Sequence, residues 1–382
     1  MLCAALLFTS TLARADTPTY YWYNPADDGS GNYASGTNYA SGTWGVDSFW
    51  TTNSTGNGPY FAYTNRADVV FAAYSEDDTW SDVGTYTVTV VNTQQVSDID
   101  FAYGTPTLQG GVLDKDTPYI SVDGIGGQIA TVNTVITSAA GTTNGVDKYA
   151  PGTLILGATN TYLGQTVVEG GTLLLGAPQV LPNTSRLLLG PLGTGGYGNT
   201  RPTFNTGGFS QTLGTLGLTG ADDGTYWTID FDYGASVLAF ADSHNEDWGG
   251  IPLRIMHYSP GVASLRFGTN SAGLTPTQLA LIDFYDFVDA PGQINAHGFV
   301  TPVFPVIQSI VQPNPGSVTI TWSTVTNRIY QVMYKLNLGD ASWQNGVKIT
   351  TTNNTTASIT ESIGANTRRF YRISLLPIPV GS

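Results

Sequence analysis

Two copies of the pattern Gly-Thr-Leu-x-Leu-Gly constrain the fold of this chain more than any other feature. The copies occupy residues 152–157 and 171–176, so the pattern recurs after nineteen residues. In each copy the alternating leucines predict a short strand, and glycine closes it where the backbone turns sharply. A strand–turn–strand unit that recurs at this period indicates a stacked β-coil, in which each turn of the coil buries the face of its neighbour.

The residues between the two copies make the pattern more specific. The segment resembles the autotransporter-associated β-strand repeat, a motif of secreted bacterial β-solenoid proteins. The matching positions are Gly152, Leu154, Leu156, Gly157, Asn160, Thr161, Tyr162, Gly164, Gly171, Leu173, Leu175 and Gly176. The resemblance implies a right-handed parallel β-helix with irregular rungs and end caps. It covers a small part of the chain and identifies an architecture rather than an activity.

The composition agrees with an extracellular all-β protein. Charged residues make up 11% of the 382-residue chain, against roughly 25% in an average soluble domain. Glycine contributes 46 residues, and aromatic residues reach 12%, which is more than a disordered chain normally carries. The sequence therefore predicts many short strands joined by tight turns.

The first fifteen residues have the pattern of a secretory signal. Residues 2–12 are apolar but too few to cross a bilayer, and Ala13-Arg14-Ala15 supplies a small-x-small cleavage site. Cleavage would remove Cys3, which is the only cysteine, and no later segment is apolar enough to span a membrane. A buried N-terminal strand is the alternative interpretation. Together with the resemblance, this pattern predicts a secreted or cell-surface protein of a Gram-negative-type bacterium, with the periplasm as an alternative.

Charge is distributed unevenly along the chain. Residues 16–302 contain 7 basic and 26 acidic side chains, a net charge of −19, whereas residues 303–382 contain 6 basic and 2 acidic ones, a net charge of +4. The acidic part disfavours nucleic acid and anionic membranes as partners. The basic C-terminal part could dock on the acidic part or on an anionic cell surface, or it could simply be a solvated surface.

The N-terminal half divides into an aromatic-rich segment and a coil. Residues 16–67 alternate aromatic with small polar residues, and we expect them to form an N-terminal cap. Within this segment Trp44 and Trp50 could stack on sugar rings, but packing in the core of the cap is the favoured interpretation. Residues 68–223 are expected to form the solenoid, with the repeat at residues 150–177.

The C-terminal half changes character twice. Residues 224–302 alternate as strands and include one predicted helix, with Thr275 as N-cap and Pro276 at its first position. This part resembles the segment that follows the repeat in its family, where it would close the open end of the coil. Residues 303–382 predict an immunoglobulin-like, fibronectin type III-like β-sandwich with Trp322, Tyr330 and Tyr371 in its core.

No residue set in the sequence has the spacing of an active site, a cofactor site or a metal site. One acidic cluster around His244 precedes Trp248 and is expected to be a solvated loop: Asp242, His244, Glu246 and Asp247. Asp230 and Asp232 are predicted to share a strand face, and a glycosidase needs two such acids across a sugar bond. A third group could bind calcium but matches no known loop spacing: Asp114, Asp116 and Asp123.

These observations predict a function without catalysis or cofactor. We expect a secreted structural or adhesive surface protein, in which a rigid acidic β-solenoid contacts a cell-surface or extracellular polysaccharide or protein. The alternative is a carbohydrate-binding or polysaccharide-degrading β-solenoid. Self-assembly through the ends or edges of the coil is a third interpretation.

Overall fold

The computed structural model describes most of the chain outside the predicted signal sequence. The described residues are 17–23, 41–54, 59–64, 66–71, 84–123, 127–191, 201–220, 226–287, 290–325, 328–351, 355–364 and 368–376. Their regular secondary structure consists of β-strands, apart from one short helix, α1 (Pro276–Leu281), and one 3-10 turn, η1 (Tyr285–Phe287). No helix in these ranges is both long and apolar enough to span a membrane.

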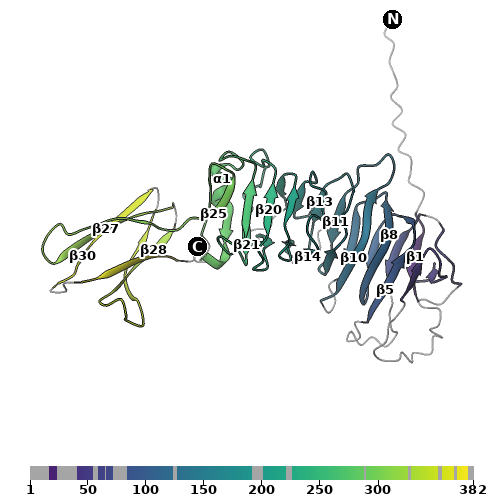
Figure 1. Cartoon of the computed structure of the whole chain (residues 1–382), viewed down its shortest axis with the longest axis horizontal. Helices are drawn as coiled ribbons and strands as arrows, with labels where there is room; N and C mark the ends of the chain where they lie inside the picture. The colour runs from purple at the N-terminus through teal and green to yellow at the C-terminus, as the bar shows by residue number, and fades with distance from the viewer. Residues whose placement is uncertain are drawn as a thin grey trace, which may run out of the picture. The chain divides into compact units, whose positions relative to one another are not determined.

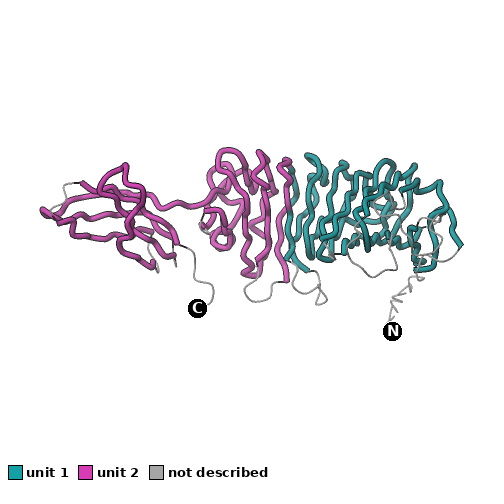
Figure 2. The backbone as a smooth tube through the Cα atoms, turned by 90° about the horizontal axis from the view of Figure 1, so that it is seen from below, with its two compact units in different colours: residues 1–204, 211–214 teal, residues 205–210, 215–382 magenta. Residues whose placement is uncertain are grey.

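The chain forms two compact units (Figure 2). Unit 1 comprises residues 1–204 and 211–214, and unit 2 comprises residues 205–210 and 215–382. All three changes of unit, after residues 204, 210 and 214, fall inside the predicted coil of residues 68–223.

Unit 1 is a parallel β-helix, as the sequence predicts. From β6 (Thr93–Val96) onward, consecutive strands of unit 1 alternate between two sheets, so each turn of the coil adds one strand to each sheet (Figure 1). The first sheet has the order β15 (Leu187–Leu189), β13 (Thr166–Val168), β11 (Val146–Tyr149), β9 (Tyr119–Val122), β7 (Ile99–Phe101), β4 (Asp68–Phe71), β1 (Thr19–Trp22) and β3 (Trp50–Thr51). The second has the order β2 (Gly42–Trp44), β5 (Thr85–Val90), β8 (Thr105–Lys115), β10 (Ile129–Ser138), β12 (Thr153–Leu156) and β14 (Thr172–Leu175), with β6 beside β8.

The two repeat copies stack directly on each other. They form β12 and β14, which pair in parallel with Leu154 opposite Leu173 and Leu156 opposite Leu175. The second of these pairs continues through the sheet as one buried row of aliphatic side chains: Val88, Leu108, Val132, Leu156 and Leu175. Burying such a row on successive strands is the main stabilising contribution of a solenoid, because each turn lacks a closed core of its own.

Two glycines of the repeat occupy places that no other residue fits. A Cβ at Gly152 would lie 2.7 Å from the Val122 carbonyl oxygen of the preceding turn. Gly171 has a φ of +63°, where a side chain costs about 1 kcal/mol or more. The glycine pattern therefore reflects close approach between successive turns as well as sharp bends.

The aromatic N-terminal segment caps the first end of the coil. Trp22, Trp44 and Trp50 are all fully buried, and the Trp50 ring centroid lies 5.0 Å from that of Trp22 and 5.1 Å from that of Trp44. The antiparallel strand β3 pairs with β1 beside this cluster. The interpretation of these tryptophans as core residues of the cap agrees with the structure, and neither Trp44 nor Trp50 presents a ring face on which a sugar could stack.

Unit 2 begins with further coiled strands and ends with antiparallel ones. β19 (Trp227–Asp230), β21 (Leu253–Met256) and β23 (Ile282–Phe284) pair in parallel, as do β20 (Val237–Phe240) and β22 (Ser264–Phe267). β25 (Phe299–Pro302) then pairs antiparallel with β22 and with β24 (Gly292–Ile294). The remaining short strands between the repeat and this region are β16 (Thr203–Asn205), β17 (Gln211–Leu213) and β18 (Leu216–Leu218).

The predicted helix is present, but its buried contact is polar. Thr275 caps α1 through a capping box with Gln278, and Pro276 is its first residue. The helix buries Gln278, whose Nε2 donates to the carbonyls of Ser243 and Glu246, at 2.9 Å each. Leu279 is half-buried and Ala280 is exposed, because the Gln278 amide anchors α1 to the turn before Trp248, whereas Ile282 at the end of the helix is buried.

The C-terminal part of unit 2 is a β-sandwich of two three-stranded antiparallel sheets. One sheet has the order β26 (Ile307–Val311), β27 (Ser317–Ser323), β30 (Thr356–Ser362), and the other β29 (Gln344–Thr350), β28 (Ile329–Lys335), β31 (Phe370–Leu376). Trp322 and Tyr330 lie in its core, as predicted, and the partly buried Tyr371 packs against that core.

Candidate functional site

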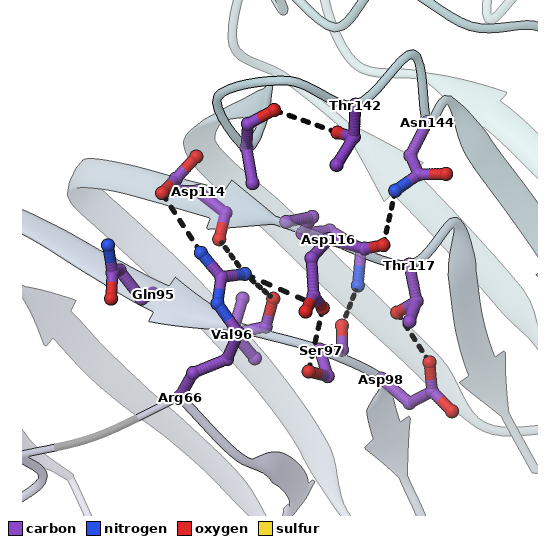
Figure 3. A network of polar contacts seen from close by, with 12 residues as sticks. Arg66, Gln95, Val96, Ser97, Asp98, Asp114, Asp116, Thr117, Thr142 and Asn144 are labelled. Atoms are coloured by element: carbon purple, nitrogen blue, oxygen red, sulfur yellow. Dashed lines mark hydrogen bonds and ion pairs between the residues drawn. The ribbon is translucent and has the colours of Figure 1, made fainter. Parts of the chain in front are cut away.

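A network of polar contacts in unit 1 surrounds Arg66, just before β4 of the first sheet (Figure 3). The Arg66 guanidinium lies 3.1 Å from the Asp114 carboxylate and 3.5 Å from that of Asp116. It also donates to the carbonyls of Val96, at 3.0 Å, and Asp114, at 2.9 Å. One cation therefore holds together three successive turns of the coil.

Short hydrogen bonds continue this cluster from turn to turn. Ser97 Oγ donates to Asp116 over 2.7 Å, and Thr117 Oγ1 donates to Asp98 over 2.5 Å. The Asp98 backbone amide in turn donates to the Asp68 carboxylate over 3.2 Å. The carboxylates of this cluster thus accept hydrogen bonds from the adjacent turn, and these acids stabilise the stacking of the turns.

Lys115 lies beneath the same cluster, inside the coil. Its side chain is 1% exposed, and its Nζ donates to the carbonyls of Ser97 and Tyr119. Burial lowers the pKa of Lys115 to about 7, although Asp98 and Asp116 oppose the shift. The Lys115 ammonium thus links the carbonyls of two turns inside the coil, just as Arg66 links successive turns nearer the surface.

A second buried lysine interrupts an apolar row of the first sheet. Lys148 stands opposite Ile120 on one side and Val168 on the other, and it is fully buried. Its Nζ donates to the carbonyls of Tyr149, Ala150 and Gly170, at 3.0, 2.6 and 3.0 Å. Burial lowers the pKa of Lys148 to about 7, against the attraction of Asp123 and Asp147.

Carboxyl groups with raised pKa values occupy the outer side of the same sheet. Burial, reinforced by the neighbouring Glu169, raises the pKa of Asp147 to about 7. Burial and the nearby Asp123 raise the pKa of Asp100 to about 6. Protonated acids of this kind serve as general acids in enzymes. However, Asp147 is only 1% exposed, and a substrate cannot reach it in this conformation.

The structure separates the acids that the sequence grouped as a calcium candidate. Asp114 and Asp116 face Arg66, whereas Asp123 accepts a hydrogen bond from Ser121 at 3.3 Å and lies near Asp100. Across the described residues, no group of three or more His, Cys, Asp or Glu side chains could hold a metal ion.

The cluster around His244 is an exposed turn, as expected. His244 Nδ1 lies 2.6 Å from Asp242, and both side chains are more than 40% exposed, at 44% and 45%. The hydrogen bonds from His244 lower the pKa of Asp242. Glu246 instead accepts a hydrogen bond from Thr215, so the side chains of this turn do not converge.

Asp230 and Asp232 do not share a strand face, which corrects the prediction. β19 ends at Asp230, and Asp232 and Tyr233 have φ values of 50° and 53° in the turn that follows. This turn brings Asp230 to His257 instead, with 2.7 Å between its Oδ1 and His257 Nδ1. The alternation of the sequence continues through the turn, so spacing alone could not locate the end of the strand.

The same region of unit 2 carries exposed aromatic rings, which sequence reasoning missed. The ring centroids of Tyr233 and His257 lie 4.5 Å apart, and Tyr233 is 62% exposed. On the neighbouring strands the Arg254 guanidinium lies 3.6 Å from the Tyr226 ring centroid and 4.8 Å from that of Tyr285, which is 50% exposed. Tyr233, His257 and Tyr285 follow the ends of β19, β21 and β23, which are neighbours in one parallel sheet, and we call these three residues the tyrosine patch.

Similarity to known proteins does not assign a function to these clusters. The chain matches no protein-family profile, no curated protein and no solved structure. The function is therefore inferred from the geometry of the described residues.

Proposed function

We propose that this protein is a secreted, non-enzymatic structural or adhesive surface protein of the autotransporter-associated repeat type. In this proposal the acidic coil is a rigid scaffold, and the C-terminal sandwich mediates contact with a cell surface or an extracellular matrix. The repeat pattern at residues 152–176 motivates the family, and the charge contrast between residues 16–302 and 303–382 motivates the division of roles.

One observation carries the scaffold proposal. In unit 1, cationic side chains join successive turns of the coil. Arg66 contacts two carboxylates and two carbonyls, and Lys148 contacts three carbonyls. Such contacts add rigidity to the stack, since a turn that leaves its place breaks bonds on both sides. A catalytic site would instead present such groups to a substrate.

The test is turnover. The mature protein would be incubated with a panel of neutral and acidic polysaccharides, and reducing ends and unsaturated products would be measured over several days. We expect no release above that of heat-denatured protein. Release that disappears in Asp147→Asn or Glu169→Gln would overturn the non-enzymatic proposal.

The proposed secretion has a separate test, because residues 1–15 lie outside the described residues. Expression of the full chain in a Gram-negative host should give a product that begins at Asp16, as measured by intact mass, and that fractionates outside the cytoplasm. An unprocessed cytoplasmic product would contradict secretion through this segment.

A carbohydrate-binding function is the second candidate, favoured by the tyrosine patch. Exposed rings beside hydrogen-bonding groups such as His257 and Asp230 can contact both the apolar face and the hydroxyls of a sugar. A glycan array compared between wild type and Tyr233→Ala/Tyr285→Ala would test it. Saturable binding that the double variant loses supports this second function.

A further inference from the structure

The two outer faces of the C-terminal sandwich have different chemistry. On the sheet β26–β27–β30, outward positions carry hydroxyl groups that pair across strands, Thr319 with Thr360 at 2.7 Å and Thr321 with Ser358. Val318 and Ile320 of β27 point into the core between them. We call this sheet surface the hydroxyl face.

The opposite sheet, β29–β28–β31, gathers cations on its outer face. Tyr330 and Val332 of β28 point into the core, so Gln331, Met333 and Lys335 lie on the other side of the sheet, where Gln331 is only 4% exposed and donates to the Gly346 carbonyl at 2.8 Å. The strand register places Lys348 opposite Gln331 and Arg372 opposite Met333. Lys335, Lys348 and Arg372 therefore lie on one surface, which we call the cationic face, and the exposed Arg368 precedes β31.

The other charged groups of the sandwich do not neutralise this face. Glu361 pairs with Arg369 at 3.5 Å, and their side chains are only 10% and 13% exposed. Arg328 is buried, at 7% exposure. Asp340 lies in the turn after β28, where its carboxylate accepts from the Asn337 backbone amide at 3.0 Å and Lys335 helps to lower its pKa. Asp340 therefore offsets part of the charge of Lys335, whose Nζ donates to the Asp340 carbonyl, and Lys348 and Arg372 leave the face with an excess of positive charge.

An indole ring holds two of the cations close together. Lys335 Nζ lies 5.2 Å from the Trp343 ring centroid, and the Arg372 guanidinium carbon lies 4.9 Å from the same centroid. Each cation gains from the ring, but two like charges beside one ring repel each other. A surface that serves only solubility usually carries positive and negative side chains in alternation. This arrangement instead favours an anion that contacts both cations.

We propose that the cationic face binds an acidic polysaccharide, a chain of sugars that bear carboxylates. The guanidinium of Arg372 can bind a carboxylate with two parallel hydrogen bonds, and Lys335 and Lys348 can bind further carboxylates along the chain. Polar side chains on the same side of the sheet, Asn345 opposite Met333 and Ser374 opposite Gln331, offer hydrogen bonds to sugar hydroxyls.

Other polyanions fit this face less well. Nucleic-acid binding proteins with strong affinity commonly contact 6–10 phosphates, which is more than these cations can supply. The acidic residues 16–302 would also repel a long, densely charged chain. Salt screens that repulsion beyond roughly 10 Å, so a polysaccharide with one carboxylate per sugar, which is less densely charged than a nucleic acid, can still bind locally. This inference rests on the proposed function, because it names the partner of the attaching sandwich.

The test uses the full mature chain and immobilised polygalacturonate, with neutral dextran as the comparison. We expect binding to polygalacturonate that weakens at least tenfold between 50 mM and 300 mM NaCl, and no binding to dextran. Lys348→Gln/Arg372→Gln should weaken binding at least tenfold, while its thermal unfolding and circular dichroism match those of the wild type.

A matched variant distinguishes the position of the cations on this face from the net charge of the protein. Thr356→Lys/Ser362→Lys adds two cations at exposed positions of β30, on the hydroxyl face. Combined with Lys348→Gln/Arg372→Gln, it restores the net charge of the wild type, and we expect it not to restore binding. Rescue by this combination would overturn the proposal, since charge alone would then suffice.

Three further outcomes would overturn it. They are equal binding to dextran, absence of binding to polygalacturonate at low salt, and binding to vesicles that contain phosphatidylglycerol in place of polygalacturonate. None of these outcomes bears on secretion or turnover. Conversely, degradation of the polysaccharide would overturn the non-enzymatic proposal and leave the binding face intact.

Discussion

At the scale of single residues, the unusual property of this protein is that ionisable groups lie within or against an apolar stack. A buried group prefers its neutral form, so burial raises the pKa of Asp147 and lowers that of Lys148, both to about 7. Each shift links folding to pH, and the two act in opposite directions along the pH scale.

Replacing Asp147 should flatten the pH dependence of stability on the acidic side. Between about pH 4 and 7 the folded chain keeps a proton on Asp147 that the unfolded chain releases, so this group's contribution to stability falls as pH rises. Asp147→Asn should reduce that slope by up to about 1.4 kcal/mol per pH unit. Urea unfolding at pH 4.5, 5.5 and 6.5 measures it. Leu163→Ala, at an exposed position without an ionisable group, should leave the slope unchanged.

Replacing Lys148 should act on the alkaline side. Between about pH 7 and 10 the unfolded chain binds a proton on this lysine that the folded chain lacks, so stability rises with pH. Lys148→Met removes this contribution, and the stability measured by urea unfolding between pH 7 and 9 should rise less steeply than in the wild type. An unchanged slope would mean that the three carbonyls keep the ammonium charged. Lys348→Met is the exposed control.

At the scale of elements, strand register decides which residues stabilise the coil. β12 and β14 align Leu156 with Leu175, and β10 aligns Val132 with the same row. The alternation visible in the repeat identified these positions from sequence. It could not identify Lys148 as their counterpart in the first sheet, because a Val-Asp-Lys-Tyr strand has no apolar alternation.

The aliphatic row gives a prediction with a control in the same repeat. Leu156→Ala leaves a cavity between turns and should lower the free energy of unfolding by about 2–5 kcal/mol. Leu163, between the two copies, is 72% exposed, and Leu163→Ala should change stability by less than about 0.5 kcal/mol. Thermal and urea unfolding of both variants measure the difference. Equal effects would contradict the stacked register.

In the molecule as a whole, different elements cover the first strands of the coil in unit 1 and the last coiled strands of unit 2. Unit 1 uses a buried tryptophan cluster and the antiparallel strand β3, and unit 2 uses the antiparallel strands β24 and β25 with α1. Covered strand edges reduce the risk of edge-to-edge association. The interpretation of self-assembly through open coil ends is therefore the least favoured of those that the sequence offered.

Opening the N-terminal cap should reveal its protective role. Trp50→Ala removes a ring that contacts Trp22 and Trp44 and should cost about 3–5 kcal/mol. We expect faster amide exchange in β1, β2 and β5 and an increase in light scattering with protein concentration. Val46→Ala, at a 61% exposed position of the same cap, should change neither. A monomeric Trp50→Ala protein with unchanged exchange would contradict the capping role.

The sequence by itself determined the architecture. Glycines at fixed spacing and alternating leucines permit little besides a stack of short strands, since each strand can bury its apolar face only on its neighbour. The aromatic cap, the N-cap of α1 at Thr275 and the core tryptophan of the sandwich were equally readable, because local spacing sets each of them.

Only the tertiary structure decided where the charged groups lie. Asp147 and Lys148 are buried, Asp114 and Asp123 are apart, and Lys348 and Arg372 share one sheet face, although none of these facts follows from local spacing. The physical reason is that each depends on pairing between strands that are distant in sequence. Register between such strands is fixed by the packing of whole layers, and a shift of one residue would reverse every side chain.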